Sequence, residues 1–243
     1  MRIVLESLGA TLREPGREFR ISVEDGLTLE AGEAYAVTGR SGSGKTLFLE
    51  LLGLLLCPDP GGQYRLEEPG CESEDLATLW TDARRRLADL RARVFGFVLQ
   101  TGGLFPFLSV RENVTISQEI TGRQDTARVS RLIEQLELDS VSRYKPGQLS
   151  IGQQQRAAVA RALSHRPAFV IADEPTSALD PELSDSVLRL LMQAARDEGA
   201  GVVVSTHDAS FAERFPVSHL RVAVDPAAGS PGRTTSRVAR APS

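Results

Sequence analysis

Apolar residues along this chain of 243 residues gather in short runs that alternate with longer segments of helical spacing. The short runs predict strands, and they cover 2–12, 19–29 (with a turn at Asp25-Gly26), 33–38, 94–99, 168–172 and 201–205. The longer segments predict helices, at 46–56, 72–93, 110–138, 150–165 and 181–196. Strands that alternate with helices indicate an α/β fold with a mostly parallel sheet covered on both faces.

The two ends of the chain differ from this pattern. Glu6 stands where a signal peptide would carry its apolar region. The most apolar stretch, Leu51 to Leu56, is far shorter than the roughly 20 residues that a membrane span needs. We therefore expect a cytoplasmic protein whose partner in any membrane process is a separate chain. From Asp225 onward Pro, Gly, Ser and Arg predominate, which predicts a disordered tail over 225–243.

Composition narrows the classes of partner and the compartment. The chain has 28 Lys and Arg against 32 Asp and Glu, a net charge of −4, so it lacks the basic footprint of a nucleic-acid-binding protein. The basic run 84–86 reads as a solvated helix face rather than a binding patch. The two cysteines, Cys57 and Cys71, are interpreted as free thiols in a reducing compartment, with a bridge between them as the alternative.

A glycine-rich loop between a predicted strand and a predicted helix fits the pattern G-x-x-x-x-G-K-[ST]; it consists of Gly39, Arg40, Ser41, Gly42, Ser43, Gly44, Lys45 and Thr46. Glycines let the backbone curl so that successive N–H groups point at phosphate oxygens. Lys45 supplies a full charge to the β- and γ-phosphates, and Thr46 a hydroxyl for Mg²⁺. The motif predicts a site for a nucleoside triphosphate or another phosphate.

Two acids end the apolar run before Pro175. Acids at the end of a parallel strand lie at the sheet edge where ligands bind. Asp173 is the candidate for holding Mg²⁺, and Glu174 the candidate for polarising an attacking water. The alternative is that the two acids only begin a loop, but the phosphate loop favours the metal role.

The segment 148–156 reads Gln-Leu-Ser-Ile-Gly-Gln-Gln-Gln-Arg and resembles the L-S-G-G-Q signature of ABC ATPases. Ser150 and Gln153 have capping-box spacing, which predicts a helix start that suits an anion; an ordinary capped helix is the alternative. Further ABC landmarks follow in order along the chain: Gln100 after a strand, the D-loop Ser177 to Asp180, and the switch His207. The resemblance covers roughly Arg2 to Val224.

Membership of the ABC ATPases would imply a P-loop NTPase core with an N-terminal antiparallel β region. It implies one nucleotide-binding domain over 1–224, with a helical subdomain at about 101–163. It also implies a homodimer that sandwiches two ATP molecules. Each site would take ATP and Mg²⁺ with residues from one chain, namely 39–46, Gln100, Asp173, Glu174 and His207. The other chain would add Ser150, Gly152 and Gln153, and Asp180 would link the two sites.

The resemblance is closest to the branch that serves lipoprotein release and macrolide export, through residues 96–100, 104–106 and 110–114. This implies integral membrane permease subunits as partners and a peripheral location on the inner face of the cell membrane. Importer ATPases share much of the pattern. A soluble ABC ATPase acting on nucleic acid or ribosomes is a rival class, and a non-hydrolysing scaffold is another.

Three details stay open at this level. Ile151 replaces the usual signature glycine, which could alter turnover. Phe19 and Leu12 are both candidates for the position that stacks on adenine. The apolar residues 104–108 are interpreted as core, with part of a docking groove as the alternative.

Overall fold

The computed structural model describes residues 1–70, 73–100, 102–208, 211–225 and 233–241. The chain forms two compact units. The first unit comprises Met1–Ala88 and Ser205–Ser243, and the second comprises Asp89–Val204.

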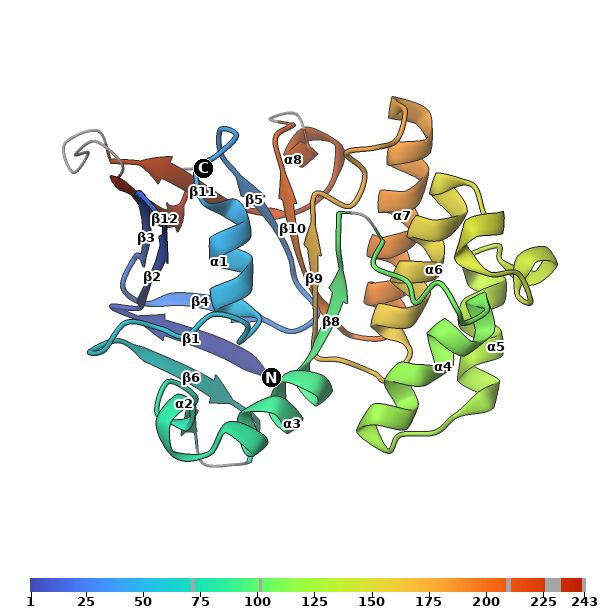
Figure 1. Cartoon of the computed structure of the whole chain (residues 1–243), viewed down its shortest axis with the longest axis horizontal. Helices are drawn as coiled ribbons and strands as arrows, with labels where there is room; N and C mark the ends of the chain where they lie inside the picture. The colour runs from blue at the N-terminus through green and yellow to red at the C-terminus, as the bar shows by residue number, and fades with distance from the viewer. Residues whose placement is uncertain (71–72, 101, 209–210, 226–232, 242–243) are drawn as a thin grey trace. The chain divides into compact units, whose positions relative to one another are not determined.

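The first unit contains an antiparallel sheet with the strand order β4-β1-β6-β7. Figure 1 shows β4, β1 and β6 side by side. Its strands are β1 (Arg2–Glu6), β4 (Leu27–Glu30), β6 (Gln63–Glu67) and β7 (Glu74–Asp75). β1 lies in the middle and pairs Ile3 with Leu29 on one side and with Leu66 on the other. These three side chains are buried, so the alternation of apolar residues sets the register of the sheet.

The first unit also holds five strands of the larger sheet, in the order β2-β3-β12-β11-β5. They are β2 (Gly9–Glu14), β3 (Arg17–Val23), β5 (Ala34–Thr38), β11 (Ser218–Val224) and β12 (Arg233–Arg240). The helices of this part are α1 (Lys45–Leu52), α2 (Leu79–Asp82), α8 (Phe211–Arg214) and α3 (Arg84–Val94), which continues into the second unit.

A break at Ser7 corrects the prediction of one strand over 2–12. Ser7 takes a φ of 47°, and its N–H and hydroxyl both donate to Oδ1 of Asp25, at 2.6 and 2.8 Å. The chain therefore leaves the antiparallel sheet as β1 and enters the larger sheet as β2. Glu72–Arg93 was likewise predicted as one helix, but its described part contains β7, α2 and α3.

The prediction of a disordered tail over 225–243 is wrong for Arg233–Arg240. This segment is β12, which pairs antiparallel with β11 and parallel with β3. Val238 is fully buried and Ser236 nearly so. A strand between two others gains ladder hydrogen bonds on both sides, and these outweigh a composition that is typical of disorder.

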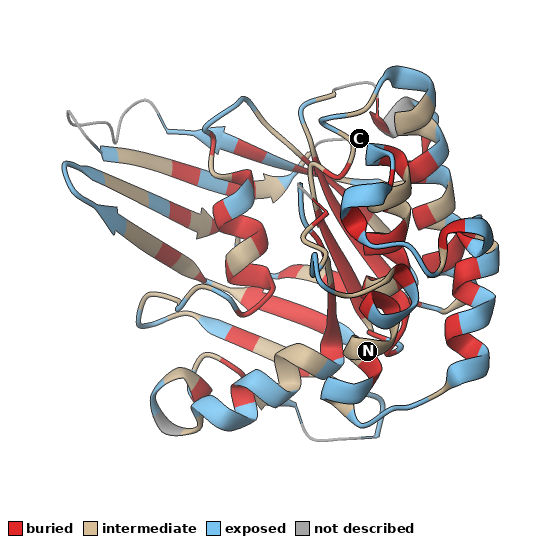
Figure 2. Ribbon diagram, turned by 45° about the vertical axis from the view of Figure 1, so that its right-hand side comes forward, coloured by how far each residue is buried: buried red, intermediate tan, exposed pale blue. Residues whose placement is uncertain are grey.

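The second unit contains the strands β8 (Phe95–Val98), β9 (Phe169–Asp173) and β10 (Gly201–Thr206). The last two residues of β10, Ser205 and Thr206, belong to the first unit. β9 lies between the other two and runs parallel to β8. The strands are buried along nearly their whole length (Figure 2), as expected for parallel strands covered on both faces.

Helices of the second unit begin and end at residues that the sequence marks clearly. They are α4 (Val110–Thr121), α5 (Thr126–Gln135), α6 (Ile151–Leu163) and α7 (Pro181–Asp197), with short 3₁₀ turns at Asp139–Val141 and Pro146–Gln148. Ser109 and Glu112 form a capping box for α4, and Gly122 ends that helix with a φ of 67°. The predicted helical segment 110–138 is therefore two helices. α6 packs against α4, α7 and β8.

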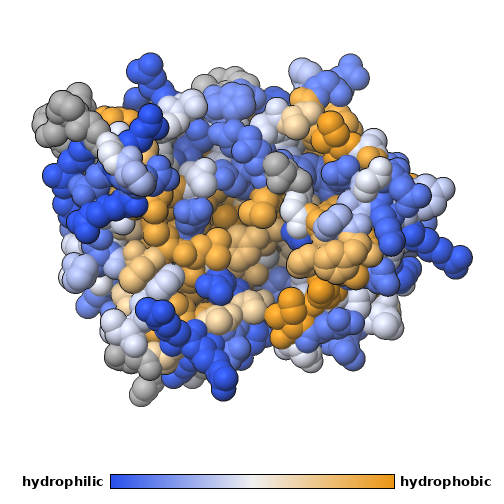
Figure 3. Space-filling model, in the orientation of Figure 1, coloured by the Kyte–Doolittle hydropathy of each residue, from blue (hydrophilic) through white to orange (hydrophobic). Residues whose placement is uncertain are grey.

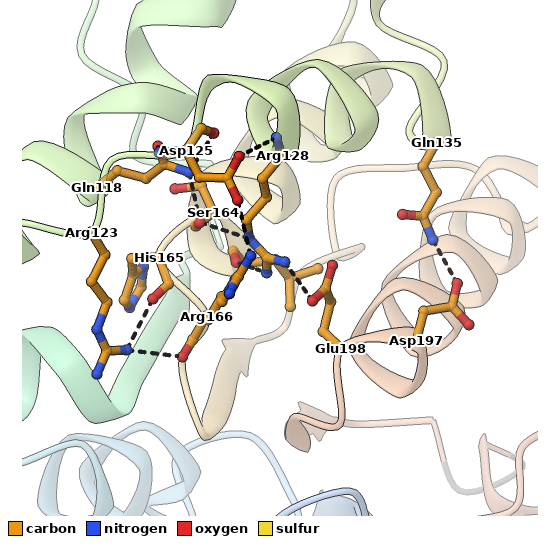
Figure 4. A network of polar contacts seen from close by, with 11 residues as sticks. Gln118, Arg123, Asp125, Arg128, Gln135, Ser164, His165, Arg166, Asp197 and Glu198 are labelled. Atoms are coloured by element: carbon orange, nitrogen blue, oxygen red, sulfur yellow. Dashed lines mark hydrogen bonds and ion pairs between the residues drawn. The ribbon is translucent and has the colours of Figure 1, made fainter.

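A buried arginine ties three of these helices together at their ends (Figure 4). Arg128 of α5 is 2% exposed and donates to the carbonyl oxygens of Leu163 (2.7 Å) and Ser164 (2.8 Å), where α6 ends. Its guanidinium also pairs at 2.5 Å with Glu198, the residue after α7. A buried charge is stable only when it is paired and hydrogen-bonded, and here those bonds hold the ends of α6 and α7 to α5.

Candidate nucleotide site

The glycine loop curls around Lys45, as its sequence predicts. Gly42 and Gly44 have φ values of 72° and 95°, a region that favours glycine. A Cβ on Gly39 would stand 2.6 Å from both the carbonyl oxygen of Val222 and Oγ of Ser43, so only glycine fits. Lys45 opens α1, is 6% exposed, and donates from Nζ to the carbonyl oxygens of Gly39 (3.2 Å) and Arg40 (3.5 Å).

Ser43 has a buried hydroxyl inside this loop. Its Oγ is buried and, among the described residues, has no hydrogen-bond partner. A buried hydroxyl without a partner is costly, and a phosphate oxygen would satisfy it. Arg40, Ser41, Gly42 and Thr46 are exposed along the same loop, so the loop is open to a phosphate from solvent.

The two candidates for an adenine contact lie in one row across the sheet. Leu12 of β2 pairs with Phe19 of β3, and Phe19 pairs with Thr234 of β12. Two residues along β3, Ile21 lies 3.7 Å from the Cβ position of Gly44. Because alternate strand residues share a face, Phe19 lies on the face of the sheet that meets the phosphate loop, and so does Leu12. Both are half-buried.

His207 follows the end of β10 in the first unit and is exposed. The turn after it is fixed, because Asp208 N–H donates to Thr206 Oγ1 at 3.0 Å and the Asp208 carboxylate pairs with Arg214. His207 is thus held at the end of a buried strand.

Asp173 ends β9 in the second unit and Glu174 follows it; both are half-buried. Glu174 has a φ of 42°, a left-handed conformation that costs a non-glycine residue about 1 kcal/mol. Its carbonyl oxygen accepts from the N–H of Ser177 at 3.1 Å. Strain of this kind is often found at functional sites.

Gln100 lies beside this turn. Its Nε2 donates to Oγ of Ser177 at 3.2 Å. The structure therefore brings Gln100 and the residues after Glu174 together within the second unit, as their strand-end positions predict.

The signature segment forms the start of α6. Ser150 caps the helix, and its reciprocal hydrogen bonds with Gln153 form the expected capping box. Gly152 is buried, and a Cβ there would stand 2.8 Å from Cδ2 of Leu183, so this glycine permits close packing of α6 on α7. Ile151 is 56% exposed.

Asp180 is exposed and caps α7, accepting from the N–H of Leu183 at 3.0 Å. Asp180 therefore has a structural role as a helix cap. Its predicted role in linking the two sites of a dimer stays a prediction. Of the predicted site residues, 39–46 and His207 belong to the first unit and the others to the second.

The apolar segment 104–108 is mostly surface. Phe105 is 38% exposed and Phe107 is 65% exposed, and apolar side chains gather over this stretch before α4 (Figure 3). The interpretation of this segment as core is therefore wrong. Arg161 supports it from α6, donating to Gly103 O at 2.6 Å, and burial lowers the pKa of this guanidinium.

The interpretation of both cysteines as free thiols is confirmed for Cys57 only. Cys57 is a free, exposed thiol, and Cys71 lies outside the described residues. No group of three or more His, Cys, Asp and Glu side chains in the described chain could hold a metal alone. A magnesium ion would thus depend on phosphate oxygens as further ligands, which is its usual mode beside nucleotides.

Residues 24–177 match the family model described as ABC transporter. The chain belongs to the ABC transporter family. The resemblance noted in the sequence is thereby confirmed, and the α/β cassette fold with it. The chain is 39% identical over 205 residues to the macrolide export ATP-binding/permease protein MacB of Shigella flexneri, covering 82% of this chain and 30% of that protein.

A second relative has about the length of this chain. The lipoprotein-releasing system ATP-binding protein LolD 1 of Rhodospirillum rubrum is 37% identical over 194 residues, covering 78% of this chain and 81% of LolD 1. Among solved structures, the post-hydrolysis dimer of the ATP-binding cassette MJ0796 with ADP and Pi is similar, with a TM-score of 0.75. The identity is 28%, and the match covers 98% of both chains.

One buried residue next to the site escaped the sequence analysis. Gln155 of α6 is 4% exposed and donates toward the segments of Gln100 and Glu174. The sequence pattern that marks Gln155 is its helical spacing: it lies on the same face of α6 as the buried residues Gly152, Val159 and Ala162. This spacing was visible in the sequence.

Proposed function

We propose that this chain binds ATP with Mg²⁺, hydrolyses it between two copies of itself, and powers transport through separate membrane permease subunits. The transporter is of the lipoprotein-release or export type. The observation that carries the proposal is the glycine loop around Lys45, with the orphaned Ser43 hydroxyl inside it. Family membership then makes a hydrolytic role the natural one.

Within one chain, the loop 39–46 holds the phosphates, and Lys45 neutralises their charge. Thr46, Gln100 and Asp173 would supply oxygen ligands for a magnesium ion, which would offset negative charge on the phosphates. Glu174 orients the attacking water and accepts its proton. His207 contacts the γ-phosphate and keeps the Glu174 carboxylate in position beside it.

The second copy completes each site with the start of its α6. The capping box uses the N–H groups of Ser150 and Gln153, and those of Ile151 and Gly152 are the other donors of the first turn. A helix N-terminus favours an anion, so this end suits a γ-phosphate on the opposing chain. Asp180 lies at the corresponding end of α7 and links the two sites. ATP then drives closure by binding the closed dimer more tightly than the open one.

Transport rests on the relatives and on one surface. LolD 1 is named as the ATP-binding protein of a lipoprotein-releasing system, and MacB as an export ATP-binding/permease protein. The present chain spans about 30% of the length of MacB, and no helix in its described part is long and apolar enough to cross a membrane. Since LolD 1 is named as one protein of a system, we propose integral membrane permease subunits as partners, which would hold this chain on the inner face of the cell membrane. The exposed residues 104–108 are the candidate docking surface.

Affinity purification from detergent-solubilised membranes of the native host tests the transport assignment. A tagged chain should recover an integral membrane protein in stoichiometric amount. The variant Phe107→Asp should recover much less, because it places a charge on an exposed apolar contact. Recovery of ribosomes or nucleic acid, with no membrane protein, would instead support the soluble class of ABC ATPases.

A further inference from the structure

Gln155 is a buried amide on the apolar face of α6, the helix that begins with the signature segment. It is 4% exposed, and its neighbours on that face are Gly152 and Val159, both buried. A buried amide costs free energy unless it is hydrogen-bonded. Its position therefore depends on the partners that it finds.

Those partners belong to two functional segments. Nε2 of Gln155 donates to the carbonyl oxygen of Gln100 at 3.3 Å and makes a short hydrogen bond to the carbonyl oxygen of Pro175. Leu99 O lies at 3.5 Å from the same nitrogen. Since an amide NH₂ group has two hydrogens, it can hold both strand ends at once.

The same two segments also bond to each other. Gln100 Nε2 donates to Ser177 Oγ at 3.2 Å, and Ser177 N–H donates to Glu174 O at 3.1 Å. A closed circuit results, running from Gln155 to Gln100, to Ser177, to the Glu174–Pro175 turn and back to Gln155. Every member lies in the second unit.

Glu174 needs such a restraint. Its φ of 42° is a conformation that a glutamate rarely adopts, and such strain persists only where surrounding bonds over-determine it. The circuit supplies a hydrogen bond at Glu174 O and another at the next carbonyl, Pro175 O.

We propose that Gln155 is a positioning residue: it holds the backbone turn that orients the Glu174 side chain. Through Gln155, the orientation of Glu174 depends on the position of Gln100. This rests on the proposed function of Glu174. A displacement of Gln100 would remove an acceptor from Gln155 and loosen the turn after Glu174. Loss of the Gln155 hydrogen bonds should therefore slow hydrolysis without weakening the binding of phosphates at residues 39–46.

The variant Gln155→Met tests this assignment because it keeps the size of the side chain but removes the donor. We expect kcat for ATP hydrolysis to fall about 10- to 100-fold, since misplacing a catalytic group by about 1 Å can cost about 100-fold in rate. The Kd for ATP of the purified chain should stay within about twofold of wild type. Ser177→Ala, at an exposed position, breaks the same circuit without altering the core, and its effect should not add to that of Gln155→Met.

Gln118→Met is the matched control. Gln118 is also a buried glutamine, 1% exposed, and it donates to carbonyl oxygens of Ser164 (2.9 Å) and Asp125 (3.2 Å), in the network of Figure 4. It should lower Tm to a similar degree and leave kcat near wild type.

An equal loss of kcat in both variants, or wild-type kcat in Gln155→Met and Ser177→Ala, would overturn the positioning role. In either case the wild-type chain still hydrolyses ATP. Absence of hydrolysis in the wild-type chain would instead count against the proposed function itself.

Discussion

At the scale of single residues, the phosphate loop depends on one buried cation. Lys45 is 6% exposed and bonds to the loop backbone, so its removal takes away both the charge for the phosphates and a support of the loop. We expect Lys45→Ala to raise the Kd for ATP at least 10-fold, measured by calorimetry. Lys145, the only other lysine, is exposed, and Lys145→Ala should leave the Kd unchanged. Equal binding by both variants would contradict the site.

Ile151 is where the chain departs from the signature of its family. Its branched, 56% exposed side chain stands on the first turn of α6, beside the N–H groups proposed to meet a γ-phosphate. We expect Ile151→Gly to raise ATP turnover a few-fold in a steady-state assay, at a stability cost of at most about 1 kcal/mol. Ile120→Gly, at a 67% exposed position of α4, should leave turnover unchanged. Lower or unchanged turnover in Ile151→Gly would show that the isoleucine is no obstacle.

The sequence predicted the residues that follow motif spacing, but it did not predict how they are held. The loop 39–46 and the capping box of Ser150 appear as expected, because both are local patterns. The bonds of Gln155 to segments 55 residues before and 20 residues after it depend on tertiary packing. The sequence shows that Gln155 is a polar residue on an apolar helix face, but it does not show which groups Gln155 bonds to.

At the scale of elements, His165 joins the end of α6 to the start of β8. It is 4% exposed, and Nε2 lies 3.1 Å from Phe95 O. Burial, with the nearby charges of Arg123 and Arg128, lowers the pKa of His165 to about 4. An unfolded histidine titrates near 6.5, so the unfolded chain takes up this proton first as pH falls.

Burial of His165 as a neutral ring therefore makes the folded state depend on pH. Its contribution to the unfolding free energy is fully present above about pH 6.5 and is lost as pH falls toward about 4. The loss amounts to about 3 kcal/mol. His165→Gln keeps a donor for Phe95 O but does not titrate. Urea unfolding at several pH values should show a flatter dependence in this variant. Parallel curves for variant and wild type would contradict the burial of a neutral ring.

Element prediction failed where long-range pairing overrides composition or pattern. β12 has the composition of a disordered segment, yet it fills the gap between β3 and β11. Ser7 breaks an apparently continuous strand through its bonds to Asp25. β3 lies far from β12 in sequence, and Asp25 lies 18 residues from Ser7. Periodicity in a single sequence carries no information about these pairings.

At the scale of the whole molecule, the central claim is that two copies of this chain share their ATP sites. The division of site residues into a loop with Lys45 and a helix start at Ser150 supports it, as does the dimeric form of the related cassette MJ0796. The domain limits of 1–224 and the helical subdomain at 101–163 stay predictions.

The most direct test is size-exclusion chromatography with light scattering on Glu174→Gln. The substitution keeps the shape of the side chain but removes the base, so ATP should bind and stay uncleaved. We expect a stable dimer with ATP, a monomer without it, and a monomer with ATP when Lys45→Ala is added. A Glu174→Gln variant that stays monomeric with bound ATP, or that hydrolyses ATP at the wild-type rate, would contradict the account.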